Sequence, residues 1–297
     1  MTEKLTAPGR QPGALLPVLA VAAVLLVVWY AGAVLLNAPQ AASLLPDAEH
    51  GNWWALARAS WSMQRPVLPA PHQILVVLGK SIFGNPLDSP RNFLYHMAVT
   101  AEAAVAGLTL ALVLGVALAV GIVHARTLDR SLMPWVIASQ TVPILAIAPM
   151  VIVVLGNLGI RGLMPKAAIA GYLSFFPITV AMVTGLRAAD PLQQDLMRTY
   201  NASGRQVFTR LSWPSSLSFL FPSLRVAVAL AVVGAIVAEL PTGAQAGLGA
   251  RLLMGSYYGQ VIDMWAALVL ASVLAALGLV AVSGVERVVI HLRGGRL

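Results

Sequence analysis

The chain has 297 residues, of which 59% are hydrophobic and only 10% are charged, and its mean hydropathy is +0.82. This composition excludes an ordinary soluble domain and predicts a protein that crosses a membrane several times. The formal net charge of +8 comes from scattered basic residues without aromatic–basic clusters, so we expect no nucleic-acid partner. The absence of cysteine excludes disulfides, thiolate metal sites and cysteine nucleophiles.

Continuous apolar runs predict about six transmembrane helices and exclude a transmembrane barrel, whose strands would alternate between apolar and polar residues. The predicted fold class is therefore an all-α, polytopic membrane protein. The predicted spans are residues 14–36, 98–123, 132–155, 167–186, 217–240 and 264–285. The first span could instead be a cleaved signal peptide, because A-P-Q-A-A follows it, but its apolar run is longer than a usual signal core.

Basic residues are distributed unevenly between the two sides of these spans. Most arginines lie on the side that includes the two tails, 1–13 and 286–297. The short loops on the other side hold only Arg161, Lys166 and Arg251. Because Lys and Arg are enriched in cytoplasmic loops, we predict that both termini are cytoplasmic and that residues 37–97 form a long external segment.

The external segment contains W-W-A-L-A-R-A-S-W at residues 53–61 and then P-A-P-H-Q-I at residues 69–74. Tryptophan rings favour the membrane interface, so we expect a short helix on the outer leaflet, followed by a second helix that a proline starts. The segment either only covers the outer ends of the spans or also contacts a partner.

Three ionisable residues fall inside predicted spans: Glu102 in the second, and Arg225 and Glu239 in the fifth. A charge at membrane depth costs at least about 2.5 kcal/mol, so such groups are expected to face a protein interior or an aqueous cavity. Arg225 and Glu239 are too far apart on one helix to pair with each other. Alternatively, Glu239 lies at the interface and extends its carboxylate to water.

The third span is interrupted by Gln140 and Thr141, beside Pro143. Pro143 together with Pro149 should free backbone carbonyls that a cavity could hydrate, so Gln140, Thr141 and Pro143 are expected to line the path. The alternative is that they make polar contacts between packed helices. In the second span, Gly107, Gly115 and Gly121 are expected to allow close helix packing.

A polar stretch, D-L-M-R-T-Y-N-A-S-G-R-Q-V-F-T-R-L-S-W-P, covers residues 195–214 between the fourth and fifth spans. Leu192, Leu196 and Tyr200 repeat at helical spacing, and Phe208 belongs to a second apolar stripe. Two short helices should therefore meet near Asn201, which tolerates a left-handed backbone. As an alternative, the whole stretch is an inert amphipathic loop.

Further expectations concern the ends of these two short helices. Asp195 is expected in the first turn of the first helix, where its charge complements the helix dipole. Arg205 and Arg210 should project from the second helix. Pro214 should end that helix and start the next span.

The histidines are dispersed and show no metal-ligand spacing, so we expect no metal site. We likewise expect no catalytic residues, because no nucleophile–base pair or pair of carboxylates occurs at usable spacing.

The polar stretch resembles a signature of the membrane-spanning subunits of bacterial binding-protein-dependent ABC importers. In that signature, E-A-A is followed by three residues and a Gly, and further along by Leu-Pro. Asp195 takes the Glu position, Asn201 the Gly position, Ala202 one of the small positions that follow, and Pro214 the terminal proline. The two alanines of the signature are replaced by Leu196 and Met197.

Other motifs match the same family, and within it the branch for nitrate, taurine, alkanesulfonates and pyrimidine-type precursors. They include L-R-V-A-V-A-L-A-V-V-G-A-I-V-A-E, which ends at Glu239, and the A-G-L-G-A-R-L-L that follows. V-P-I-L-A-I-A-P-M in the third span and F-F-P-I-T in the fourth also match. The resemblance covers nearly the whole chain beyond residue 65.

The resemblance implies a type I importer fold in a bacterial inner membrane, with residues 37–97 periplasmic and residues 98–285 forming a five-helix core that includes the cytoplasmic loop 187–216. It implies that this loop is a coupling helix that docks on a cytoplasmic ATPase dimer. The implied coupling residues are Asp195, Asn201, Ala202, Arg205, Phe208, Arg210 and Pro214. The further partners implied are the lipid bilayer, a second permease subunit of the same or a paralogous chain, and a periplasmic substrate-binding protein.

No G-x-x-x-x-G-K-[ST] motif occurs, so ATP is expected to bind the partner ATPase, and this chain is expected to need no cofactor. The predicted function is inward movement of a small polar organic or anionic solute, resembling nitrate, a sulfonate or a pyrimidine. The candidate path residues are Glu102, Gln140, Thr141, Arg225 and Glu239. A self-sufficient secondary transporter or channel is the alternative, although no clear inverted repeat is visible.

Overall fold

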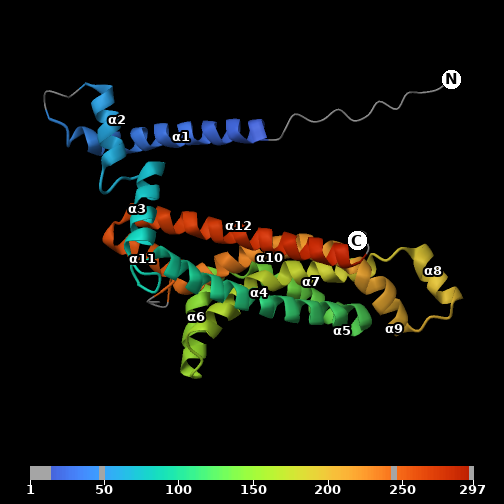
Figure 1. Ribbon diagram of the computed structural model, residues 1–297. Helices are drawn as coiled ribbons and strands as arrows, with labels where there is room; N and C mark the ends of the chain where they lie inside the picture. The colour runs from blue at the N-terminus through green and yellow to red at the C-terminus, as the bar shows by residue number, and fades with distance from the viewer. Residues whose placement is uncertain (1–14, 47–50, 242–245, 294–297) are drawn as a thin grey trace, which may run out of the picture.

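The computed structural model describes residues 15–46, 51–241 and 246–293, and every regular element in these ranges is a helix. Within the described residues, five helices are long and apolar enough to cross a membrane. They are α1 (Leu15–Ala42), α4 (Phe93–His124), α7 (Leu163–Arg187), α10 (Trp213–Glu239) and α12 (Val261–Leu292). The predicted all-α membrane fold is thus confirmed. Figure 1 shows that α4, α7, α10 and α12 lie side by side.

The predicted span 132–155 is not one straight helix. It is divided between α5 (Arg126–Ala138), the short 3₁₀ helix η2 (Ser139–Thr141) and α6 (Ile144–Asn157). The two α-helices are bent by 105° at the break, so α6 leaves the bundle sideways (Figure 1). The cause is Pro143, which lacks an N–H and forces Val142 into an extended conformation, with φ −78° and ψ 122°.

Several other helices extend past their predicted ends. The first runs to Ala42 rather than to residue 36, and α12 includes residues 286–292, which were predicted to be a tail. Hydropathy marks where a helix loses its apolar character, whereas backbone hydrogen bonding continues until a cap or a breaker ends the helix. Helices whose ends are predicted from hydropathy alone are consequently too short.

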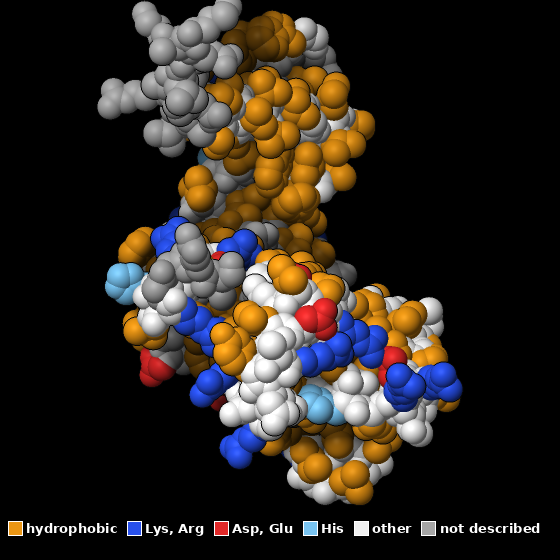
Figure 2. Space-filling view, turned by 90° about the vertical axis from the view of Figure 1, so that its right-hand side faces the viewer, with side chains coloured by type: hydrophobic (Ala, Val, Ile, Leu, Met, Phe, Trp, Pro, Cys, Tyr) orange, Lys and Arg blue, Asp and Glu red, His pale blue; other side chains and the backbone are white. Residues whose placement is uncertain are grey.

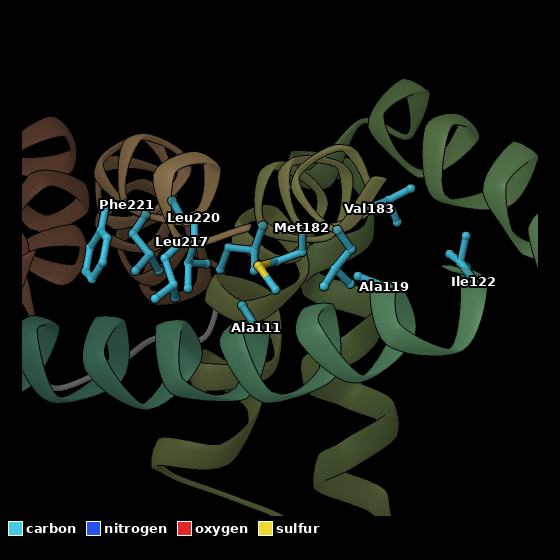
Figure 3. Packing of buried hydrophobic residues seen from close by; sticks show 12 residues of the cluster. Ala111, Ala119, Ile122, Met182, Val183, Leu217, Leu220 and Phe221 are labelled. Carbon is cyan, nitrogen blue, oxygen red and sulfur yellow. The ribbon is translucent and has the colours of Figure 1, made fainter. Parts of the chain in front are cut away.

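The core is formed by α4, α7 and α10. Figure 3 shows Ala111 and Ala119 of α4 facing Met182 and Val183 of α7, with Leu217, Leu220 and Phe221 of α10 beside them. These side chains are buried and almost entirely aliphatic. Dispersion contacts between such closely packed groups are what hold helices together when the surroundings are as apolar as the core itself.

Small residues bring these three backbones into direct contact. A Cβ added to Gly107 of α4 would lie 2.5 Å from Cβ of Ala170 in α7, and one added to Gly234 of α10 would lie 2.6 Å from Cα of the same alanine. The predicted packing role is confirmed for Gly107 and also for Gly115, whose added Cβ would lie 3.0 Å from Thr179 Oγ1. Gly121 has only ordinary clearance, 3.4 Å to a leucine side chain, so no close approach depends on it.

The segment predicted to be external forms two helices, as expected: α2 (Trp53–Ser62) and α3 (Pro71–Gly84), with Pro71 starting the second. The side chain of Asn37 in α1 connects this segment to α1 through four hydrogen bonds. Its amide nitrogen donates to the Leu68 and Ser60 carbonyls, and its amide oxygen accepts from the N–H groups of Val67 and Leu68. The rings of Trp29 and Trp265 lie 5.1 Å apart and connect α1 to α12. The rest of α1 stands clear of the bundle (Figure 1).

We predict that Gly234→Val destabilises the protein, because the new side chain collides with the backbone of α7 rather than with a movable side chain. Overpacking of this kind costs about 1–3 kcal/mol. The matched control is Gly284→Val in α12, where an added Cβ meets nothing within 4 Å. Thermal unfolding of both purified variants in detergent provides the measurement, and equal midpoints would contradict the close contact.

Candidate coupling and path sites

The polar stretch between α7 and α10 forms α8 (Pro191–Thr199) and α9 (Gly204–Val207), which project from one end of the bundle (Figure 1). We call this the α8 end, and the opposite end, where α11 (Leu248–Tyr258) lies, the α11 end. The prediction that Asp195 occupies the first turn is wrong. The helix begins four residues earlier, because Asp190 caps it by accepting from the Leu192 N–H at 2.9 Å and Pro191 has a fixed helical φ.

Asp195 instead lies at the middle of α8 and accepts from Arg198 at 3.0 Å, with both side chains mostly exposed. Asn201 was expected to adopt a left-handed backbone at the turn, and this is confirmed. Its φ is 48°, and it is the one non-glycine residue with positive φ in the described chain. The next helix then starts at a capping box, in which Ser203 and Gln206 satisfy each other's backbone N–H. Ala202 lies between these two features, so the turn is fixed from both sides.

Pro214 does not end the second helix, contrary to prediction. The chain continues from α9 through a π-helical segment, η3 (Phe208–Ser212), directly into α10. Within this segment the Trp213 N–H donates to the Phe208 carbonyl, one residue further back than in an α-helix. The wider turn makes room for the ring of Pro214, which has no N–H to donate, inside the continuous helix. α9, η3 and α10 are therefore parts of one continuous helix.

The exposed surface of this projection combines apolar and basic side chains. Leu192 and Tyr200 are each 77% exposed and Leu196 is 55% exposed, so the first apolar stripe has no partner within the described chain. Arg205 on α9 and Arg210 on η3 are also exposed, and Figure 2 shows basic side chains over this end of the molecule. Phe208 is half-buried, with its ring 5.2 Å from that of His124. The projection is thus anchored on one side and open on the other.

The predicted path residues fall into three different settings. Glu102, Gln140 and Thr141 are exposed, the last two in the break between α5 and α6. Arg225 pairs with Glu286 of α12, which the sequence analysis missed, and so does not pair with Glu239, as expected. An exposed Glu102 on a membrane helix fits an aqueous cavity or a partner surface, whereas Arg225 ties two helices together.

Glu239 is completely buried at the α11 end, so the alternative that it extends to water is wrong. Its carboxylate accepts from Thr100 Oγ1 of α4 at 3.0 Å and from the Gly249 N–H of α11 at 2.9 Å. Lys166 of α7 lies 3.4 Å away as its cationic partner. Four helices therefore converge on one carboxylate.

The A-G-L-G motif is explained by this carboxylate. Gly247 has φ 128°, and a Cβ there would lie 2.1 Å from the Glu239 carboxyl carbon. The Gly247 N–H donates to Nδ1 of the buried His96, so the other ring nitrogen, Nε2, carries the proton and donates to the Pro90 carbonyl at 2.8 Å. The Leu248 N–H donates to Thr100 Oγ1 at 2.8 Å. Sequence reasoning missed His96, Thr100 and Lys166, since only the tertiary fold brings them to Glu239.

A bundle of apolar helices with an exposed helical projection at one end and a buried polar network at the other defines a membrane-embedded, multi-pass protein. Residues 111–291 match the family described as "Binding-protein-dependent transport system inner membrane component". The match covers more than half of the chain, and the chain belongs to this family. It is thus an inner-membrane ABC transporter permease, a class of subunit that works with an ATPase and a substrate-binding protein.

Relatives of this family transport different solutes, according to their names. The chain is 33% identical to the formylaminopyrimidine transport permease protein of Halalkalibacterium halodurans, over 76% of this chain and 86% of the relative. It is 31% identical to the riboflavin transport system permease protein of Chloroflexus aurantiacus, over 53% and 57%. It is 22% identical to a putative aliphatic sulfonates transport permease protein of Bacillus subtilis, over 75% and 77%.

We predict that Thr100→Val destabilises the protein, because it removes a donor to Glu239 and leaves the buried Leu248 N–H without its acceptor. An unsatisfied buried group costs about 1–3 kcal/mol. Thr109→Val on the same helix is the matched control, because Thr109 is exposed and bonds only to the Val105 carbonyl of its own helix. If both variants unfold at the same temperature in detergent, Thr100 is not structurally important.

Proposed function

We propose that this chain is the subunit that moves a small polar organic or anionic solute inward by alternating access, driven by a separate ATPase. The observation that carries the proposal is the continuous helix from Gly204 to Glu239, which joins the exposed projection at one end to the buried network at the other. A partner that pushes on α9 would act on a rigid rod that packs against α4 and α7.

Docking of a cytoplasmic ATPase dimer on α8 and α9 is supported by their surface. Leu192, Leu196 and Tyr200 offer apolar anchors, and Arg205 and Arg210 offer charges that would orient a partner with acidic residues. Asn201 and Ala202 fix the turn between the two helices, and Phe208 and Pro214 connect it to the span. ATP would be bound by that partner, and this chain would be non-catalytic.

A second permease subunit, either the same chain or a paralogue, is supported by the apolar surface that this chain leaves uncovered. Most of α1 is exposed, and α6 leaves the bundle with Leu145, Met150 and Val153 exposed. Lipid can cover part of this surface, but exposed Glu102, Gln140 and Thr141 at membrane depth need water or protein. A translocation path between two facing subunits would supply both. A periplasmic binding protein would deliver the solute at the α11 end.

The solute is a small polar compound in this proposal, and the names of the relatives leave its identity broad. A pyrimidine precursor, riboflavin and aliphatic sulfonates share polar groups but not size or charge. The alternative function, a self-sufficient secondary transporter or channel, is distinguished by flux. The chain alone, reconstituted in liposomes without ATPase, would then carry solute, whereas an importer subunit would not.

We predict that the α8 end and both termini are cytoplasmic. The chain has no cysteine, so a single Gln193→Cys in α8 and a single Gln64→Cys in the external segment can each be labelled selectively; both positions are exposed. An impermeant thiol reagent applied to intact spheroplasts should label only the second, and inverted vesicles should reverse the pattern. Labelling of both from one side would contradict this topology.

We predict that Arg205→Glu weakens ATPase binding about tenfold or more, since it reverses an exposed charge without touching a span. Pull-down of the ATPase with purified permease measures this, and Arg293→Glu, an exposed arginine directly after α12, is the control. Unchanged binding would remove Arg205 from the docking surface.

We predict that Asn201→Val also uncouples the complex, because a β-branched residue at φ 48° is strained by about 1–3 kcal/mol. Asn201→Gly relieves that strain and should retain solute-stimulated ATP hydrolysis in vesicles. Equal hydrolysis by the two variants would show that the shape of this turn does not matter for coupling.

A further inference from the structure

A cavity of about 620 Å³ opens at the α11 end of the molecule, between the last turns of α6 and the start of α7. Its apolar wall comes mainly from α6, including Ile152 and Val153. Its polar groups are Asn157, Arg161 and Lys166, together with Ala246 from the loop before α11. The cavity is large enough for a small organic solute and is open to one side.

The charges at this cavity are unbalanced. Arg161 is exposed and forms no ion pair with any residue that the structure describes. Lys166 is only 14% exposed, and its ammonium group lies 3.4 Å from Glu239 and 3.3 Å from the Ala246 carbonyl. Since Glu239 balances at most one of the two cations, the cavity carries an excess of positive charge beside an apolar wall.

We propose that this cavity is a binding site for a small organic anion, such as a sulfonate or a carboxylate, with Arg161 and Lys166 holding its charged group. Arg161 offers a planar fork of donors that matches two oxygens of such a group, and Lys166 offers a compact charge at the end of the cavity nearest Glu239. The apolar wall from α6 accepts the organic part. The site's place at the outer end of a transport path rests on the proposed function, whereas its charge and shape do not.

Lys166 also connects the cavity to the buried network. An anion in the cavity would compete with Glu239 for the Lys166 ammonium group. Glu239 would then depend more on Thr100 and on the Gly249 N–H, so occupation of the cavity alters the contacts that hold the start of α11. Binding at the outer end is thereby linked to the end of α10, the helix whose other end continues into α9.

The test uses the full chain in membranes and measures electrostatic potential in the cavity. Asn157→Cys places a single thiol in the lining, and Leu44→Cys, at an exposed position in the external segment, is the reference. Each is labelled with two methanethiosulfonate reagents of similar size, one carrying a sulfonate and one a trimethylammonium group. We expect the ratio of the anionic to the cationic rate to be about tenfold higher at Asn157 than at the reference.

Two further variants assign this ratio to residues. Adding Arg161→Gln to Asn157→Cys should bring the ratio of labelling rates to within about twofold of the reference. Adding Lys166→Gln to Asn157→Cys should lower this ratio less, because Glu239 already offsets the charge of Lys166. Millimolar methanesulfonate should slow labelling at Asn157 and leave the reference unchanged. Unfolding temperatures of both variants control for loss of structure, and Arg161→Gln alone suffices if Lys166→Gln does not fold.

Equal ratios at the two positions, or a raised ratio that survives Arg161→Gln, would overturn the anion site. A raised ratio without protection by methanesulfonate would show positive charge but no bound anion, and would also overturn it. None of these measurements needs the ATPase. A failed site with normal ATPase pull-down therefore rejects only this inference, and failed pull-down with normal labelling rejects only the coupling proposal.

Discussion

The contact of three helix backbones at Gly107, Ala170 and Gly234 is the constraint on which the rest of the molecule depends. Lipid is as apolar as a leucine side chain, so burial alone does not drive membrane helices together. Small residues allow α4, α7 and α10 to approach until their backbones touch, and many weak dispersion contacts then add up. The α8–α9 projection and the Glu239 network are both connected to these three helices.

The central position of α10 has a mechanical consequence. Together with η3 and α9 it forms an uninterrupted helix of 36 residues, about 54 Å long at 1.5 Å per residue. One end carries exposed arginines, and the other carries a carboxylate that receives hydrogen bonds from α4 and α11. A helix of this length transmits a push better than a hinged pair would. The π-helical segment adds local adjustment at Pro214 without breaking the rod.

The sequence predicted the features that depend on local chemistry. Hydropathy located the membrane helices, and a residue that tolerates a left-handed backbone located the turn at Asn201. Three expectations were wrong because a stronger local signal competed with the one chosen: Asp190 and Pro191 started α8, Pro143 bent the third span, and a π-helical turn accommodated Pro214. Partners such as Glu286, Lys166 and His96 could not be predicted, since their sequence separation contains no information about which side chains meet.

Glu239 shows why a membrane protein keeps a charge inside its core. Burying an ion pair costs several kcal/mol of desolvation per ion, and the attraction between the partners recovers this only when the remaining hydrogen-bonding groups are satisfied. Thr100, Gly249 and Lys166 bind this carboxylate from three other helices at once, so a shift of Lys166 weakens the ion pair and a shift of Thr100 or Gly249 removes a hydrogen bond from a buried charge. The pair therefore specifies one arrangement of the α11 end rather than adding general stability. In the proposed alternating-access function, a change between two conformations would have to break some of these contacts and form others.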